Sequence, residues 1–170
     1  MKRFFQKRID LIKVDRPVRS GFRISAVIFA VLVFCFMALP SCVYQLGDQI
    51  AEYTAAQELF VGNLAIGNLT LGNDPAWPAF IGYLGSALAG IGCFLLLNRK
   101  ILLIDLIGAI LSFILVATQP LFTIMRFTET YSNGTFTFGL GYILPLIFSF
   151  GIVVCLAVVY VLPSKDGEKA

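Results

Sequence analysis

Four long runs of apolar residues alternate with polar segments along the chain. The runs contain at most one charged residue each and cover 24–44, 78–97, 101–124 and 140–162. An α-helix rises 1.5 Å per residue, so about 20 residues cross the roughly 30 Å hydrocarbon core of a bilayer. The pattern therefore predicts an all-α integral membrane protein whose four transmembrane helices form an antiparallel bundle.

The polar segments between these runs differ in length and in charge. We expect basic cytoplasmic segments at 1–23, 98–100 and 163–170, and extracytoplasmic loops at 45–77 and 125–139. The longer loop, 45–77, is expected to form a small cap on the bundle. The turn at 98–100 is so short that the second and third helices must be antiparallel neighbours.

The first extracytoplasmic loop combines two patterns. Its first half, Gly47 to Phe60, has apolar residues at helical spacing and predicts a short amphipathic helix. Its second half repeats every five residues, as Val61-Gly-Asn-Leu-Ala, Ile66-Gly-Asn-Leu-Thr and Leu71-Gly-Asn-Asp-Pro. This repeat resembles the pentapeptide pattern of quadrilateral β-solenoids, although three units do not complete one coil. The alternative is short extended pieces joined by Gly-Asn turns, because both residues tolerate positive φ.

The distribution of basic residues indicates the orientation. All lysines and arginines except Arg126 lie in the two tails and the 98–100 turn. The positive-inside rule places these segments in the cytoplasm, in a plasma or inner membrane, with both termini inside. A basic start before an apolar run is also typical of a signal peptide, but the long basic region and Pro40 favour a retained anchor.

The N-terminal tail has apolar residues on one face of a predicted helix, which Pro17 should end. Such a basic amphipathic helix binds an anionic membrane surface; alternatively, the tail is solvated and only sets the orientation. The residues expected to contact lipid are Lys2, Arg3, Lys7, Arg8 and Lys13.

Composition argues against an enzyme. Hydrophobic residues make up 58% of the chain and charged residues 14%, against about 25% charged residues in soluble domains. Histidine, the commonest general base and metal ligand, is absent. The four cysteines lie in or beside apolar runs and form no C-x-x-C pair. We therefore expect no catalytic residue, no metal site, no cofactor and no nucleic-acid partner.

Two residues within the apolar runs are candidates for a polar site. Asp105 is either a proton or cation site, or an interfacial partner of Arg99 or Lys100 near a helix N-terminus. Gln119, followed by Pro120, interrupts the third run. It either lines a substrate path or marks a kink near the end of the helix.

Other motifs indicate packing and modification. The second run carries small residues at helical spacing, which let helices approach closely within the chain or against a partner. They are Gly82, Gly85, Ser86, Ala89 and Gly90. Asn68 and Asn133 begin glycosylation sequons in the predicted outer loops, which matter only if the source is eukaryotic.

The four-span layout with a longer first outer loop resembles the claudin topology. The claudin outer-loop Trp–Gly-Leu-Trp–Cys–Cys signature is absent, as are the tetraspanin loop cysteines, so no family is assigned. We expect a non-enzymatic accessory or scaffolding subunit of a membrane complex, with the lipid bilayer and another membrane protein or itself as partners. The alternative is a small transporter or pore component with Asp105 and Gln119 as polar lining.

Overall fold

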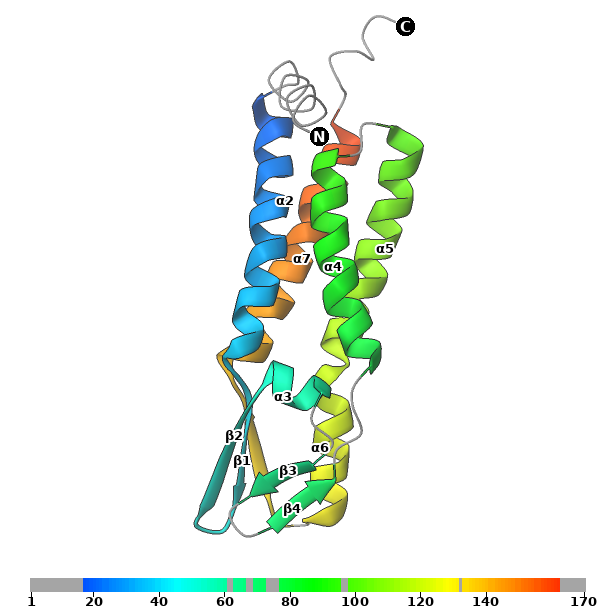
Figure 1. The fold of residues 1–170 in the computed structure, drawn as a ribbon. Helices are drawn as coiled ribbons and strands as arrows, with labels where there is room; N and C mark the ends of the chain where they lie inside the picture. Colours follow the sequence, from blue (N-terminus) through cyan, green and yellow to red (C-terminus); the bar gives the residue numbers. More distant parts are fainter. Residues whose placement is uncertain are drawn as a thin grey trace, which may run out of the picture.

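The computed structural model describes residues 17–60, 63–66, 69–72, 77–95, 98–131 and 133–162. It is mostly helical, and four long helices lie side by side (Figure 1). They are α2 (Pro17–Cys35), α4 (Trp77–Leu95), α5 (Arg99–Ala117) and α7 (Leu140–Val161). Four helical segments in the described chain are long and apolar enough to cross a membrane, which confirms the prediction of four apolar helices.

The helices have two different ends (Figure 1). At one end, α2 begins, α4 turns into α5 and α7 finishes; we call this the basic end, because it carries Arg19, Arg23, Arg99 and Lys100. The other end carries all five described strands and the helices α3 (Ala55–Phe60) and α6 (Gln119–Thr130), which together form the cap.

The first helix starts and ends earlier than expected. It begins at Pro17 and continues through the 3-10 turn η1 (Phe36–Ala38), whereas the sequence predicted 24–44. Proline suits a first helical position because its fixed φ matches the helix and its missing N–H needs no partner. Leu39 is extended, as a residue before proline prefers to be, so the helix stops before Pro40. The expected helix within 1–15 lies outside the described residues.

The third apolar run forms two helices instead of one. The helix α5 ends at Ala117, Thr118 forms a turn, and α6 begins at Gln119 with Pro120 in its first turn. Pro120 cannot donate a backbone hydrogen bond, which favours a new helix start over a continuous helix. The expected loop 125–139 consequently contains the second half of α6.

A three-stranded antiparallel sheet joins the segment that follows α2 to the segment that precedes α7. Its strand order is β2 (Gln49–Thr54), β1 (Pro40–Leu46) and β5 (Thr135–Phe138). Tyr44 in β1 lies opposite Ala51 on one side and Phe136 on the other. The β1–β2 turn contains Gly47 at φ +60°, a conformation that glycine adopts without steric cost.

The amphipathic helix predicted for Gly47 to Phe60 is wrong over most of its length, because only Ala55–Phe60 is helical. Pairing with β1 satisfies the backbone of β2, and the Tyr53 side chain is buried. In the repeat region, β3 (Asn63–Ile66) and β4 (Leu69–Gly72) pair antiparallel. This antiparallel pairing agrees with the expected extended pieces rather than with the coil of a solenoid, and the expected Gly-Asn turn at 67–68 lies outside the described residues.

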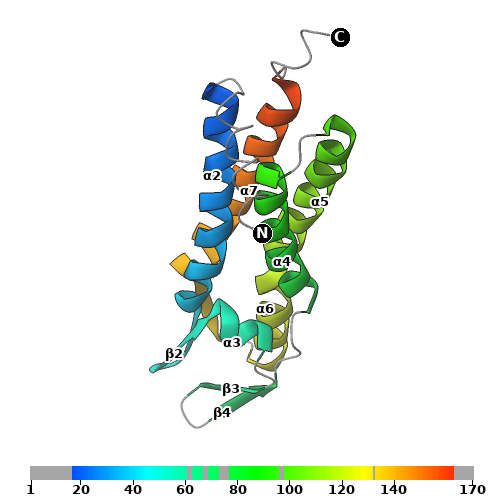
Figure 2. The same cartoon turned by 45° about the horizontal axis from the view of Figure 1, so that its top comes forward.

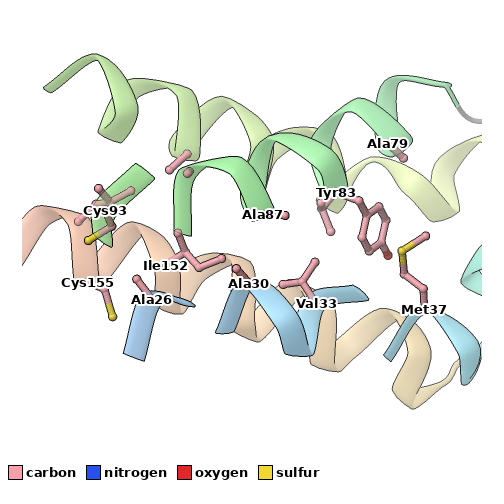
Figure 3. Packing of buried hydrophobic residues seen from close by; sticks show 14 of the residues in the cluster. Ala26, Ala30, Val33, Met37, Ala79, Tyr83, Ala87, Cys93, Ile152 and Cys155 are labelled. Atoms are coloured by element: carbon pink, nitrogen blue, oxygen red, sulfur yellow. The ribbon is translucent and has the colours of Figure 1, made fainter. Parts of the chain in front are cut away.

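Small side chains let the long helices pack closely. Figure 3 shows Ala26, Ala30 and Val33 of α2 beside Ala87 of α4 and Ile152 of α7, all in one buried cluster. Between helices in lipid, association depends on van der Waals packing rather than on the hydrophobic effect. The small side chains therefore allow the backbones of these helices to approach closely.

Candidate functional site

The junction between the cap and the helices contains a buried carboxyl group. Glu58 belongs to α3, which lies between the strands and the ends of α4 and α6 (Figure 2). A capping box starts this helix: the Thr54 N–H donates to Gln57 Oε1 over 2.9 Å, and the Gln57 N–H donates to Thr54 Oγ1 over 3.2 Å. The box sets the first turn of α3, and the Glu58 side chain is 0% exposed.

Three donors from two other elements reach the Glu58 carboxyl group. Ser41 Oγ and Tyr44 Oη, both on β1, donate over 2.7 Å and 3.0 Å. Gln119 Nε2, at the start of α6, donates over 2.9 Å. The Tyr83 hydroxyl of α4 donates to Gln119 Oε1 and extends the network into the long helices. We call Ser41, Tyr44, Glu58, Tyr83 and Gln119 the Glu58 cluster.

Aromatic side chains surround the cluster on the cap side. The Tyr44 ring lies 4.8 Å from the Phe127 ring of α6 and 5.9 Å from the Tyr53 ring, measured between centroids. The Tyr53 hydroxyl donates to the main-chain oxygen of Ala65 and so links β2 to the β3–β4 hairpin. The cluster is therefore enclosed by apolar rings, which reduce its access to water.

Burial sets the protonation of the cluster. It raises the pKa of Glu58, and the hydrogen bonds from Ser41, Gln119 and Tyr44 only partly oppose this effect. Burial, with the nearby Glu58 charge, raises the pKa of the Cys42 thiol to about 12 and also raises the pKa of Tyr44. Cys42 therefore stays a thiol at neutral pH and is a poor nucleophile.

The chemistry available to this arrangement is narrow. Glu58 can gain or lose a proton, while its hydroxyl and amide partners hold α3, β1, α4 and α6 together. Within the described ranges, no three His, Cys, Asp or Glu side chains are grouped so that they could hold a metal ion. The cluster is thus a joint between the cap and the helices.

At the basic end, arginines contact the ends of helices. The Arg23 side chain is 0% exposed, and its Nη1 donates to the Cys93 carbonyl oxygen in the last turn of α4 over 3.0 Å. Arg19 Nε donates to the Val159 carbonyl oxygen in the last turn of α7 over 3.1 Å. Such carbonyls lack helical partners and carry partial negative charge, so a cation stabilises them. The sequence analysis expected both arginines in a cytoplasmic tail, but they are buried residues of α2 that contact the neighbouring long helices.

The structure separates the two candidate polar residues. Gln119 is buried in the Glu58 cluster, whereas Asp105 lies partly buried between α4 and α5. Fourteen residues separate them, which is about 20 Å of helical rise. The expected ion pair of Asp105 is not found among the described residues, and the Arg99 guanidinium lies over the Tyr160 ring instead, 5.0 Å from its centroid.

The predicted packing residues contact neighbouring helices of the same chain. A Cβ atom on Gly82 would come within 2.8 Å of the α5 backbone at Ser112 and Val116, and one on Gly90 within 2.6 Å of the Ala26 oxygen in α2. Ser86 is 1% exposed and Ala89 is also buried. A Cβ atom on Gly85 would contact the Ser112 hydroxyl.

Of the remaining candidates, the structure describes only Asn133. Asn133 is exposed in a turn between α6 and β5. Asn68 and the lipid-surface residues Lys2, Arg3, Lys7, Arg8 and Lys13 lie outside the described residues.

Comparison with known proteins finds no matching family model, no similar curated protein and no similar solved structure.

The residue at the centre of the site, Glu58, was not among the sequence candidates. In the sequence it is one of several acidic residues between the first two apolar runs. The capping-box spacing of Thr54 and Gln57 is a usable signal for α3, and the apolar Leu59 and Phe60 beside Glu58 hint at burial. No local pattern, however, links Glu58 to Gln119, which lies 61 positions along the chain.

Proposed function

We propose that this chain is a non-enzymatic accessory or scaffolding subunit of a membrane complex, built as an antiparallel bundle of four transmembrane helices with an extracytoplasmic cap. The observation that carries the proposal is the use of buried polar groups. Those in the Glu58 cluster bond to one another and join the cap to the helices. A scaffold needs such a rigid joint to hold its partners at fixed positions.

The arrangement of charge supports the proposed orientation. The start of α2, the α4–α5 turn and the end of α7 share one end of the helices, next to the basic sequence segments (Figure 1). The positive-inside rule assigns that end to the cytoplasm. The cap, at the opposite end, would then lie outside the cytoplasm, in a plasma or inner membrane.

The transporter alternative has less support. A transport path needs several polar groups in one cavity, but Asp105 and Gln119 lie near opposite ends of the third apolar run, and Gln119 is engaged in the cluster. The backbones of α4 and α5 also approach too closely at Gly82 to leave space for a solute there. The exposed surface of the helices, including Ile81 and Leu111, is suited to lipid or to another helix.

Gentle purification tests the function. The tagged full chain, extracted from its native membrane in a mild detergent, should retain at least one other integral membrane protein in a fixed ratio after cross-linking. Purified alone into vesicles, it should not increase the flux of protons, sodium or potassium. A partner-free chain whose vesicles show a flux that Asp105→Asn or Gln119→Ala abolishes would contradict the proposal and favour the transporter.

Thiol labelling tests the orientation independently. Single cysteines at Gln57 and at Asn98 occupy exposed positions at the cap end and the basic end. In a background without the native cysteines, an impermeant reagent should label Gln57→Cys in intact cells and Asn98→Cys only after permeabilisation. Labelling of Asn98→Cys from outside would reverse the proposed orientation.

A further inference from the structure

A groove of about 310 Å³ runs along the surface between α4 and α5, in the half of the helices nearer the basic end. Small residues line it: Gly85 and Ala89 on α4, and Gly108 on α5. A Cβ atom on Gly108 would meet no other atom within 4 Å, so the groove is open at this point. Leu88 and Ile104 also line the groove and are 60% and 69% exposed.

Asp105 places a carboxyl group in this groove, whose other lining residues are apolar or small except for Ser112. Its Oδ2 atom is buried and has no hydrogen-bond partner in the described part of the chain. The carboxyl group packs onto α4 at Gly92, where an added Cβ atom would lie 2.6 Å from Oδ2. Ionisable side chains within membrane helices almost always pair with one another or with backbone carbonyls. The groove thus contains an acceptor whose donor is not among the described residues.

We propose that the groove binds a transmembrane helix of a different membrane protein, which supplies a lysine or arginine to Asp105. Small residues on both walls let the backbone of such a helix approach closely, as packing in lipid requires. The carboxyl group selects a helix with a cation at matching depth over a purely apolar one. The inference rests on the proposed scaffolding function and names the partner chemistry of one of its surfaces.

A second copy of this chain fits the groove less well. Most homodimers are symmetric about a twofold axis, so the same surface of each copy would meet. Two Asp105 carboxyl groups would then face each other at the same depth, and like charges at short distance repel. A partner helix with a basic residue removes this conflict and gives the Asp105 carboxyl group an opposite charge.

Energy transfer in vesicles tests the proposal with a defined probe. The full chain, with a donor dye on a C-terminal tag, is reconstituted in phosphatidylcholine. Two synthetic leucine–alanine transmembrane helices carry an acceptor dye and differ only in one lysine, placed two turns from one end. The lysine helix should reach half-maximal transfer at a peptide-to-lipid ratio about tenfold lower than the control helix, the size of one polar interhelical contact.

Two variants locate the binding. Asp105→Asn should remove the preference for the lysine helix while the thermal stability of the chain is retained. Gly108→Leu fills the groove with a side chain at an open position and should weaken binding of both helices. Equal binding of the two helices to the unmodified chain, a preference that survives Asp105→Asn, or unchanged binding to Gly108→Leu would each overturn the proposal.

Other occupants give distinguishable results. Transfer between two differently labelled copies of this chain that Asp105→Asn abolishes would assign the groove to self-association. Loss of the lysine preference when phosphatidylethanolamine is added would assign it to an amine-bearing lipid. Either result would overturn the proposed partner. If native partners stay bound to Asp105→Asn, the scaffolding function survives and only the groove assignment fails.

Discussion

Both ends of the four long helices bury a side chain that can carry charge, but each end surrounds it differently. At the cap end, Glu58 receives hydrogen bonds from hydroxyl and amide groups of Ser41, Tyr44 and Gln119. At the basic end, Arg23 donates to main-chain carbonyls in the last turn of α4. One buried ionisable group thus joins the cap to the long helices, and the other joins α2 to the end of α4.

The difference lies in what protonation can change. A guanidinium group does not lose its proton in proteins, and the C-terminal carbonyls of a helix complement its charge. A carboxyl group, in contrast, can change its protonation state with pH, and burial raises the pKa of Glu58. We therefore expect the cap joint to respond to pH and the arginine joint to be insensitive to it.

The largest effect should come from removing the Glu58 carboxyl group. Glu58→Ala leaves the buried donors of Tyr44 and Gln119 without their acceptor, and each such group costs about 1–3 kcal/mol, while Ser41 keeps the Tyr53 carbonyl oxygen as an acceptor. The free energy of unfolding should fall by about 3 kcal/mol or more, measured in detergent by thermal or denaturant unfolding. Glu58→Gln keeps the shape and one acceptor oxygen and should lose less than half as much. Equal losses from both variants would show that the carboxyl group has no special role.

Removing the Arg23 guanidinium should have the next largest effect. Arg23→Met keeps much of the side-chain volume but loses the charged hydrogen bonds to α4, each worth about 1.5–3 kcal/mol. Arg99→Met is the matched control, because the exposed Arg99 loses only a contact with the Tyr160 ring, worth about 0.5–1 kcal/mol. The melting temperature of Arg23→Met should be clearly lower than that of Arg99→Met. If the order is reversed, Arg23 does not support the helix ends.

Two glycine substitutions compare the packing inside the helices with the open groove. In Gly90→Ala the new Cβ atom would lie 2.6 Å from Ala26 O and from Ala30 Cβ, so α2 must move. Overpacking of this kind costs about 1–3 kcal/mol. In Gly108→Ala the added atom meets open space, and replacing glycine in a helix contributes about 0.5–1 kcal/mol of stability. Melting temperatures that move in the same direction would contradict the assigned contacts.

The smallest effect should be the pH dependence of the cap joint. Because the folded pKa of Glu58 is raised, the protonated carboxyl group favours the folded state at pH values below the usual carboxyl pKa. This contribution is lost as the pH rises through the raised pKa. Thermal stability of the unmodified chain should therefore fall relative to that of Glu58→Gln as the pH increases from about 4 to about 8. Two parallel curves would show that Glu58 titrates normally.

The other polar groups of the joint do not obscure this measurement. The pKa of Cys42 is about 12, and the pKa of Tyr44 is also raised, so both stay neutral over that range. Ser41 and Gln119, which also donate to the carboxyl group, are a hydroxyl and an amide, and Tyr83, which donates to Gln119, is a phenol. Subtracting the Glu58→Gln curve removes contributions from groups elsewhere in the chain.

Regions with strong periodic or compositional signals could be predicted from the sequence. The four apolar runs form helices over most of their length, because a long apolar segment in lipid can satisfy its backbone polar groups only by hydrogen bonding within itself. The connection at 98–100 was also predictable, because a turn this short forces the helices on either side, α4 and α5, to be antiparallel neighbours. The boundaries were less accurate: α2 begins at Pro17, within the expected tail, and a new helix, α6, begins at Gln119, within the expected third helix.

The cap could be predicted only in part. Sequence patterns indicated extended pieces in the repeat region but placed a helix over most of Gly47 to Phe60, where β2 forms. The partner of β1 on its second side, β5, lies about 90 positions later in the chain. β1 and β5 can pair only after the long helices have brought the two strands to the same end of the molecule. The local periodicity of the sequence contains no information on that arrangement.

By itself, the sequence determined the class of structure: apolar runs long enough to cross a bilayer, basic segments between them, and no histidine-based chemistry. These properties follow from composition and spacing, which act locally. Only the tertiary structure decided that Glu58 is buried, that Arg23 contacts the end of α4, and that Asp105 lies in a surface groove. Placing a charged side chain at the surface costs little free energy, whereas burying it in a core costs much more. Which of the two occurs depends on contacts between segments that are distant in the sequence.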